Sequence, residues 1–201
     1  MSELAYDVLV NNDNLLSPFY CPSNLIVTDD NENNFHQYKD PTLKPMIRED
    51  IYPYILKMME DAKKEGIFFI LDSGYRSYEY QKVLLDKLLA QLGDSAYQKI
   101  ALPGASEHQT GLAFDVAYYN NGVYSDDVKG DDKEAIWLAN NSYRYGFILR
   151  YPKGKEHVTG FQYEPWHFRF VGFELAKILF QEDITLEEYY ERNKGSSRIL
   201  L

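Results

Sequence analysis

The spacing of hydrophobic residues in the first half of the chain predicts a helix, a buried strand and a second helix. Over residues 48–64, apolar side chains recur at helical spacing on one face, which predicts an amphipathic helix. Residues 67–71 form an unbroken apolar run of the kind found in buried strands. A second helix is expected over residues 78–92, where Ser77 is placed to cap its first turn.

The second half alternates short strands with short helices. Strands are predicted over residues 112–117, 147–151 and 166–171, and helices over 132–144, 175–180 and 186–192. Asn120, the residue after it and Gly122 form a turn that is suited to closing a β-hairpin. Because short strands and a hairpin signal dominate, we expect an α+β fold with a central antiparallel sheet flanked by helices, rather than a parallel doubly wound fold.

The start of the chain is more polar and irregular than the rest. Residues 1–45 carry clusters of Asn and Asp and several prolines, with one apolar stretch at 25–27 that is compatible with a short strand. We expect this segment to be an arm packed on the core formed by residues 46–201. A chain of 201 residues fits a single domain overall.

The composition bears on which molecules the protein binds and on where it is located. The net charge is −10, from 31 acidic and 21 basic residues, which argues against nucleic acid because phosphates would be repelled. Cys21 is the single cysteine and has no intrachain partner. No apolar stretch approaches the ~20 residues of a membrane span, and the first residues lack the features of a secretion signal. We therefore expect a cytoplasmic protein; the alternative is an extracytoplasmic protein whose signal or anchor segment has been removed.

Two histidine-containing stretches have the residue types of a metal centre. His108 and Asp115 lie seven residues apart around Gly111, and Glu164 and His167 lie three apart. Two imidazoles and one carboxylate would supply three ligands and leave the fourth tetrahedral position open, as a hydrolytic zinc site requires. Spacing alone does not decide which carboxylate would bind the metal and which would transfer protons.

Hydrolysis would also need a base and a partner for the developing oxyanion. Glu164 is the candidate base, and Arg76, in a glycine-containing turn after a predicted strand, is the candidate oxyanion partner. A lone histidine is more often structural than a ligand, so the residue pattern by itself supports a metal site and a structural interpretation equally. We expect His36, His157 and the acidic stretch at 126–132 to be solvated.

Three motifs in order identify a family resemblance. They are Ser-Gly-Tyr-Arg-Ser at 73–77, Ser-Glu-His-Gln-Thr-Gly-Leu-Ala-Phe-Asp at 106–115, and Glu-Pro-Trp-His at 164–167. Together they resemble the D-alanyl-D-alanine carboxypeptidase family of zinc peptidases, the VanY type, which includes the VanXY D,D-dipeptidase/D,D-carboxypeptidases. The similarity in order and spacing extends from about residue 9 to residue 190, nearly the whole chain.

The resemblance implies a role for each matching residue. One catalytic zinc ion would be held by His108, Asp115 and His167. Catalysis would use Glu164 as base and Arg76 to polarise the scissile carbonyl. Substrate contacts would come from Gln81, Ser106 and Trp166. The implied fold is the small zinc-peptidase fold with a central antiparallel sheet, shared with hedgehog-type proteins.

The implied reaction is hydrolysis of the terminal D-Ala-D-Ala bond of peptidoglycan precursor stem peptides, with the free D-Ala-D-Ala dipeptide as a further substrate, as in vancomycin-type resistance. Two alternatives use the same motifs. The first is an L,D-carboxypeptidase or endopeptidase of stem peptides. The second is a non-catalytic zinc-containing module that binds the cell wall. The presence of Glu164 and Arg76 argues against that second alternative, because a structural zinc ion needs neither.

Overall fold

The structure, a computed structural model, describes residues 3–28, 45–120 and 122–194, and its main sheet is antiparallel throughout. Strands β3, β4, β7 and β6 lie in that order, and β5 pairs with β4 alone. The five strands are β3 (Ile70–Ser73), β4 (Ala113–Asn120), β5 (Val123–Ser125), β6 (Phe147–Leu149) and β7 (His167–Phe170). A separate two-stranded sheet joins β1 (Leu25–Val27) to β2 (Met46–Arg48). The predicted α+β fold with an antiparallel sheet is confirmed.

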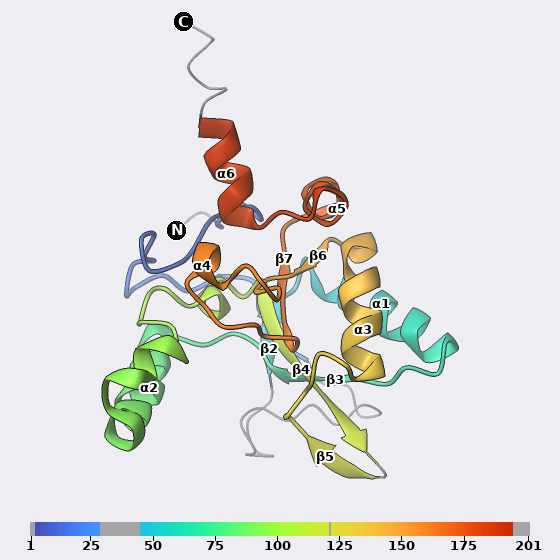
Figure 1. Cartoon of the computed structure of the whole chain (residues 1–201), viewed down its shortest axis with the longest axis horizontal. Helices are drawn as coiled ribbons and strands as arrows, with labels where there is room; N and C mark the ends of the chain where they lie inside the picture. The colour runs from blue at the N-terminus through green and yellow to red at the C-terminus, as the bar shows by residue number, and fades with distance from the viewer. Residues whose placement is uncertain (1–2, 29–44, 121, 195–201) are drawn as a thin grey trace, which may run out of the picture.

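Helices surround this sheet. The α-helices are α1 (Tyr52–Lys64), α2 (Tyr78–Leu92), α3 (Lys133–Asn141), α4 (Glu156–Thr159), α5 (Phe173–Glu182) and α6 (Leu186–Lys194). The 3-10 turns are η1 (Gly93–Gln98), η2 (Glu107–Thr110) and η3 (Ser142–Tyr145). Helices α1 and α3 lie on one side of the molecule and α2 on the other, while α5 and α6 lie at the end opposite the β4–β5 hairpin (Figure 1).

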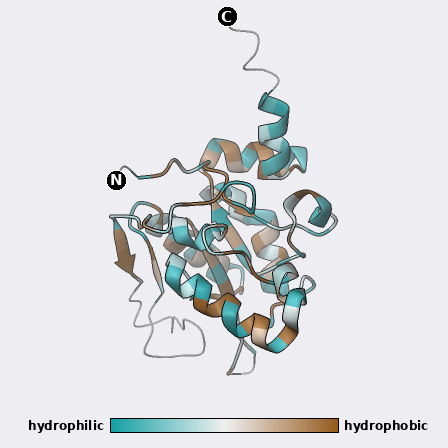
Figure 2. Cartoon of the chain, turned by 90° about the vertical axis from the view of Figure 1, so that its left-hand side faces the viewer, coloured by the Kyte–Doolittle hydropathy of each residue, from teal (hydrophilic) through white to brown (hydrophobic). Residues whose placement is uncertain are grey.

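The core lies between the sheet and helices α1 and α3. Phe114, Phe147 and Phe170 come from three strands and pack edge to face, with ring centroids 5.0–5.2 Å apart. They meet Met58 of α1 and Leu138 of α3, and all five are at most 1% exposed. Burial of each such side chain stabilises the fold by roughly 1.5–3 kcal/mol. Figure 2 shows this partition, with brown strands inside and a mostly teal α6 near the C-terminal end.

Local signals place several elements where the sequence predicts them. Helix α2 has the predicted bounds, and the Ser77 hydroxyl accepts a hydrogen bond from the Tyr80 amide at 3.1 Å. The strand expected over residues 67–71 begins later, at Ile70. The reason is the end of α1, where the amide of Ile67 bonds back to the Ala62 carbonyl at 3.0 Å and delays the extended conformation.

The described part of the N-terminal segment contacts the core through buried arginines. Arg169 donates to the carbonyl oxygens of Tyr6 and Val8 at 3.0 and 2.9 Å. Arg48 donates to the Leu4 carbonyl at 2.9 Å. The predicted division into an arm of residues 1–45 and a core from residue 46 stays a prediction, since 29–44, including His36, lie outside the described residues. Within the described ranges, no helix combines the length and the apolar character that crossing a membrane requires.

Candidate active site

The register of the central strands brings distant motif residues together. In the β4–β7 pair Asp115 lies directly opposite His167, and in the β3–β4 pair it lies opposite Ser73. Residues opposite each other in an antiparallel pair have Cβ atoms about 4.5–5.5 Å apart on the same face of the sheet. The carboxylate of one motif and the imidazole of another are therefore neighbours because of strand pairing.

His108 reaches the same point from the η2 turn. Its Nδ1 lies 2.7 Å from the Gly74 carbonyl oxygen, and its own carbonyl accepts a hydrogen bond from the Arg76 amide at 3.2 Å. Residue 74 must be glycine here, because a Cβ would lie 2.2 Å from the Met46 carbonyl oxygen. The first and second motifs are thus tied to each other, and the His108 ring is held with Nε2 facing the cluster.

The three predicted ligands form a tight cluster. Asp115 Oδ1 lies 2.9 Å from His167 Nδ1 and 3.3 Å from His108 Nε2. One ligand atom from each residue lies within 4.8 Å of the other two, and the imidazole rings meet edge to face with centroids 4.8 Å apart. His108 Nε2 is buried and makes no hydrogen bond of acceptable geometry within the described part of the chain. A buried polar atom without a partner is costly, and a cation between these three groups would satisfy it.

The protonation states of the cluster differ sharply. Burial and the charge of Arg76 lower the pKa of His108 to about 4. Burial also opposes charge on His167, but the Asp115 and Glu107 carboxylates outweigh it and raise the pKa of His167 to about 9. Burial opposes charge on Asp115 too, yet the two imidazoles hold the pKa of that carboxyl well below its usual range. At neutral pH a metal ion entering the cluster would displace a proton from His167.

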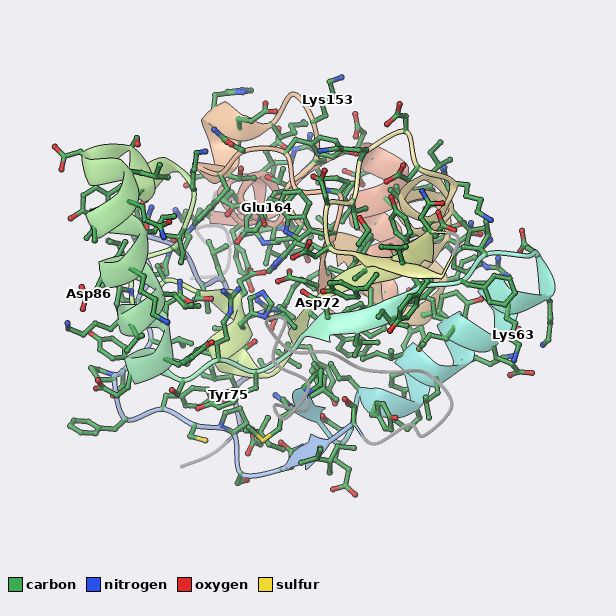
Figure 3. The ribbon with its side chains drawn as sticks, turned by 90° about the horizontal axis from the view of Figure 1, so that it is seen from below. Lys63, Asp72, Tyr75, Asp86, Lys153 and Glu164 are labelled. Carbon is green, nitrogen blue, oxygen red and sulfur yellow. The ribbon has the colours of Figure 1, made fainter. Side chains whose placement is uncertain are left out.

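Glu164 lies beside the cluster without belonging to it. Its Oε2 is 3.8 Å from His167 Nδ1, and 18% of its side chain is exposed. Burial, reinforced by Asp115 and opposed by His167, raises the pKa of Glu164 to about 7. A carboxyl group with a pKa near neutrality is well matched to proton transfer at that pH. In Figure 3 Glu164 lies in the middle of the molecule, whereas the labelled Lys63 and Asp86 lie at its periphery.

A cleft of about 190 Å³ opens onto the cluster. All eight residues predicted for the site line it: Arg76, Gln81, Ser106, His108, Asp115, Glu164, Trp166 and His167. Arg76 Nη2 lies 3.9 Å from Asp115 Oδ2. Gln81 donates from Nε2 to the Ala101 carbonyl at 2.8 Å, while its buried Oε1 has no hydrogen-bond partner among the described residues. The lining of the cleft thus combines an arginine beside the cluster with a buried acceptor that has no partner among the described residues.

The cleft also contains residues that sequence reasoning missed. The Tyr151 ring packs in a tilted orientation against that of His167, with ring centroids 5.0 Å apart, and the exposed Lys99 also lines the cleft. Glu107 is 1% exposed and also lines the cleft. The sequence offered one signal for Glu107, its position directly before His108 in the second motif. A residue next to a buried ligand is expected to be buried too, and a buried acidic residue needs a charged partner.

Comparison with known proteins places this geometry in a family. The family model described as VanY, D-alanyl-D-alanine carboxypeptidase, matches residues 44–173. The putative carboxypeptidase YodJ of Bacillus subtilis is 41% identical over 187 residues, which cover 92% of this chain and 67% of YodJ. A D-alanyl-D-alanine carboxypeptidase of Enterococcus faecalis is 37% identical over 155 residues, 72% of this chain and 55% of the relative. The bifunctional dipeptidase and carboxypeptidase VanXYC of Enterococcus gallinarum is 38% identical over 161 residues, 74% of this chain and 83% of VanXYC.

Solved structures show the same fold. The LdcB LD-carboxypeptidase superposes with a TM-score of 0.80 at 40% identity, covering 91% of this chain and 84% of LdcB. A D,D-pentapeptidase VanY from a VanB-type resistance cassette, in complex with Zn(II), gives 0.72 at 32% identity, covering 92% and 98% of the two chains. The D,D-dipeptidase VanXYg, in complex with a D-Ala-D-Ala phosphinate analog, gives 0.78 at 30%, covering 95% and 72%. The predicted zinc-peptidase fold and peptidase class are confirmed, and the chain belongs to the VanY family of D-alanyl-D-alanine carboxypeptidases.

Proposed function

We propose that this protein is a zinc-dependent D,D-carboxypeptidase that removes the terminal D-alanine from peptidoglycan stem peptides ending in D-Ala-D-Ala. The observation that carries the proposal is the division of labour in the cleft. Three groups converge on one point, and a fourth, Glu164, lies next to them with a pKa near 7. A structural zinc site would need four protein ligands and no such neighbour.

His108 Nε2, His167 Nδ1 and Asp115 Oδ1 are the atoms that would hold the ion. When bound, zinc supplies a Lewis acid that polarises the scissile carbonyl and lowers the pKa of the attacking water. Glu164 takes the proton from that water and passes it to the nitrogen of the leaving D-alanine. Arg76 stabilises the negative charge that develops on the carbonyl oxygen.

The remaining lining residues orient the substrate. Ser106 lies two residues before His108, Trp166 lies directly before His167, and both line the cleft. Gln81 Oε1 offers an acceptor for an amide N–H of the bound peptide, because its Nε2 is already engaged by the Ala101 carbonyl. Such positioning contacts raise the rate by holding the scissile bond against the reacting groups.

A second specificity is favoured by one observation. The LdcB structure, an LD-carboxypeptidase, is similar to this chain at a TM-score of 0.80 and 40% identity. The VanY and VanXYg structures, named for D,D-activities, are similar at 0.72 and 0.78. We therefore propose L,D-carboxypeptidase activity as the second candidate function. This activity removes D-alanine from a tetrapeptide stem.

Product identification on three substrates tests both candidates. The zinc-loaded protein is incubated with free D-Ala-D-Ala, a pentapeptide stem and a tetrapeptide stem, with and without a chelator, and products are identified by mass spectrometry. The D,D-carboxypeptidase proposal predicts chelator-sensitive release of one D-alanine from the pentapeptide. Release from the tetrapeptide alone identifies the L,D-enzyme. No release from any substrate by the zinc-loaded protein would contradict both and favour a binding module.

A further inference from the structure

Glu107 is a buried carboxylate that the proposed mechanism does not use. Its Oε2 lies 3.6 Å from His167 Nε2, the ring nitrogen that faces away from the cluster. Both atoms are buried, and neither has a hydrogen-bond partner among the described residues. The gap is slightly longer than a hydrogen bond, so a small rotation of either side chain closes it.

Metal binding at His167 would explain why a carboxylate faces its Nε2 atom. An imidazole that binds a cation through Nδ1 is neutral and keeps its proton on Nε2. In His167 that proton points into the protein, where a donor without an acceptor is costly. Glu107 Oε2 is the acceptor that faces it. The other imidazole is held in the same way, since His108 Nδ1 lies 2.7 Å from the Gly74 carbonyl oxygen.

We propose that Glu107 is a positioning residue of the metal site: it accepts a hydrogen bond from Nε2–H of His167 and so holds Nδ1 toward the metal. The inference rests on the proposed function, in which His167 is a zinc ligand. Partners of this kind fix the tautomer and the orientation of a ligand histidine.

A network of buried charges, which we call the Glu107 network, leaves that oxygen available. Glu107 Oε1 forms ion pairs with two buried arginines, with Arg150 Nε at 2.8 Å and Arg169 Nη1 at 2.9 Å. Arg150 also forms a two-pronged ion pair with Glu187 of α6, at 2.9 and 2.5 Å. The network therefore holds two cations and two anions. Within the part of the chain that the structure describes, the carboxylate oxygen of the network that faces His167 has no hydrogen-bond partner.

The network supplies a matched pair of variants. Glu107→Gln and Glu187→Gln each remove one negative charge from it, but only the first changes the group facing His167. In Glu107→Gln the amide oxygen must face the two arginines, which turns the NH₂ group toward the N–H of His167. The variants are compared by zinc affinity, in competition with a chromophoric chelator, and by the visible spectrum of the Co²⁺-substituted protein.

We expect Glu107→Gln to bind zinc about 10- to 100-fold more weakly, with shifted cobalt bands. Glu187→Gln should stay within about threefold of the wild type and keep its cobalt spectrum, because its carboxylate does not reach a ligand. Equal losses in the two variants would reduce Glu107 to a structural role and overturn the inference. Wild-type zinc affinity in Glu107→Gln would overturn it too, while leaving the zinc site intact; absence of zinc binding in the wild type would overturn the proposed function as well.

A measurement on the wild type keeps the test decisive if Glu107→Gln does not fold. In the zinc-loaded protein labelled with ¹⁵N-histidine, NMR should show His167 bound through Nδ1, with a slowly exchanging, downfield Nε2 proton. The exposed His157 provides the internal reference for fast exchange. Coordination of His167 through Nε2, or an Nε2 proton that exchanges as fast as those of His157, would contradict the role of Glu107.

Discussion

Two groups of buried charges meet at His167, and they differ in how completely their charges are paired. In the Glu107 network each charge faces an opposite charge at 2.5–2.9 Å. Burial opposes charge on Glu107, but the two arginines outweigh it and hold its pKa below the usual range. Around the cluster of His108, Asp115 and His167 the pairing is incomplete: His108 Nε2 has no hydrogen bond in the described structure, and burial raises the pKa of the neighbouring Glu164 to about 7.

This difference in pairing indicates which buried groups serve catalysis and which stabilise the fold. Buried polar groups without partners destabilise a fold, so their presence in the cluster indicates a site shaped for a ligand. Paired buried charges are different, since removing one partner leaves the other uncompensated. We therefore expect substitutions in the cluster to change activity more than stability, and substitutions in the network to do the reverse. Glu107 belongs to both groups, because its two oxygens face different partners.

The largest expected effect is on catalysis, in Glu164→Gln. The variant should lose about 10²- to 10⁴-fold in kcat/KM, because the amide cannot accept the proton. It should keep one zinc ion per chain and unfold no earlier than the wild type, since a buried carboxyl with a raised pKa contributes little to stability. Kinetics, metal analysis and urea unfolding check these three points. Loss of zinc from this variant would make Glu164 a ligand and erase the distinction between base and cluster.

The largest expected effect on stability is in the network, in Arg150→Met. Removal of this fully buried arginine leaves Glu187 without its ion-pair partner and should cost about 3–5 kcal/mol of unfolding free energy. Urea unfolding in the presence of a chelator measures this cost without a contribution from bound metal. Arg144→Met, at an exposed arginine, is the matched control and should change stability by less than about 0.5 kcal/mol. Equal stability of the two variants would show that the network does not stabilise the fold.

A smaller catalytic effect is expected in Arg76→Gln. Loss of the charge next to the cluster should lower kcat by about 10²- to 10³-fold, because oxyanion stabilisation acts in the transition state. Zinc affinity should remain within a few-fold of the wild type, as Arg76 is not a ligand. Steady-state kinetics separate kcat from KM. A rise in KM at constant kcat would assign Arg76 to substrate binding instead.

The smallest effect is the pH dependence of zinc binding. His167 is protonated at neutral pH, with a pKa of about 9, whereas His108, with a pKa of about 4, is already neutral. Zinc must displace the proton from His167, so zinc affinity should rise about tenfold between pH 7 and pH 8 and level off above pH 9. Competition titrations at several pH values measure the slope. An affinity that is constant over this range would show that neither imidazole carries a displaceable proton.

Elements with local signals were predictable, and those defined by distant partners were not. Helix α2 follows from its own periodicity and its Ser77 cap, and the β4–β5 hairpin follows from the turn that ends at Gly122. Strand β2 has three residues and exists through its pairing with β1, so no periodicity marks it. Pairing with a segment far away in the chain is a tertiary property that a short sequence window does not contain.

In the candidate site, too, residues in recognisable motifs were predictable, whereas a residue whose role depends on distant partners was not. Its three ligands lie in recognisable motifs, and the β4–β7 register then brings Asp115 to His167. Glu107 was missed although it lies within a motif, because its role depends on Arg150 and Arg169. Arg150 lies directly after β6 and Arg169 lies within β7; both are buried, although in the sequence they resemble surface residues.

Anomalous diffraction at the zinc edge, from crystals of the zinc-loaded protein, tests the proposed metal centre most directly. The proposal predicts one strong peak bounded by His108 Nε2, His167 Nδ1 and Asp115 Oδ1, at about 2.0–2.2 Å from each, with Glu164 outside the coordination sphere. A peak that includes Glu164 as a ligand, or the absence of a peak between the two imidazoles, would contradict it.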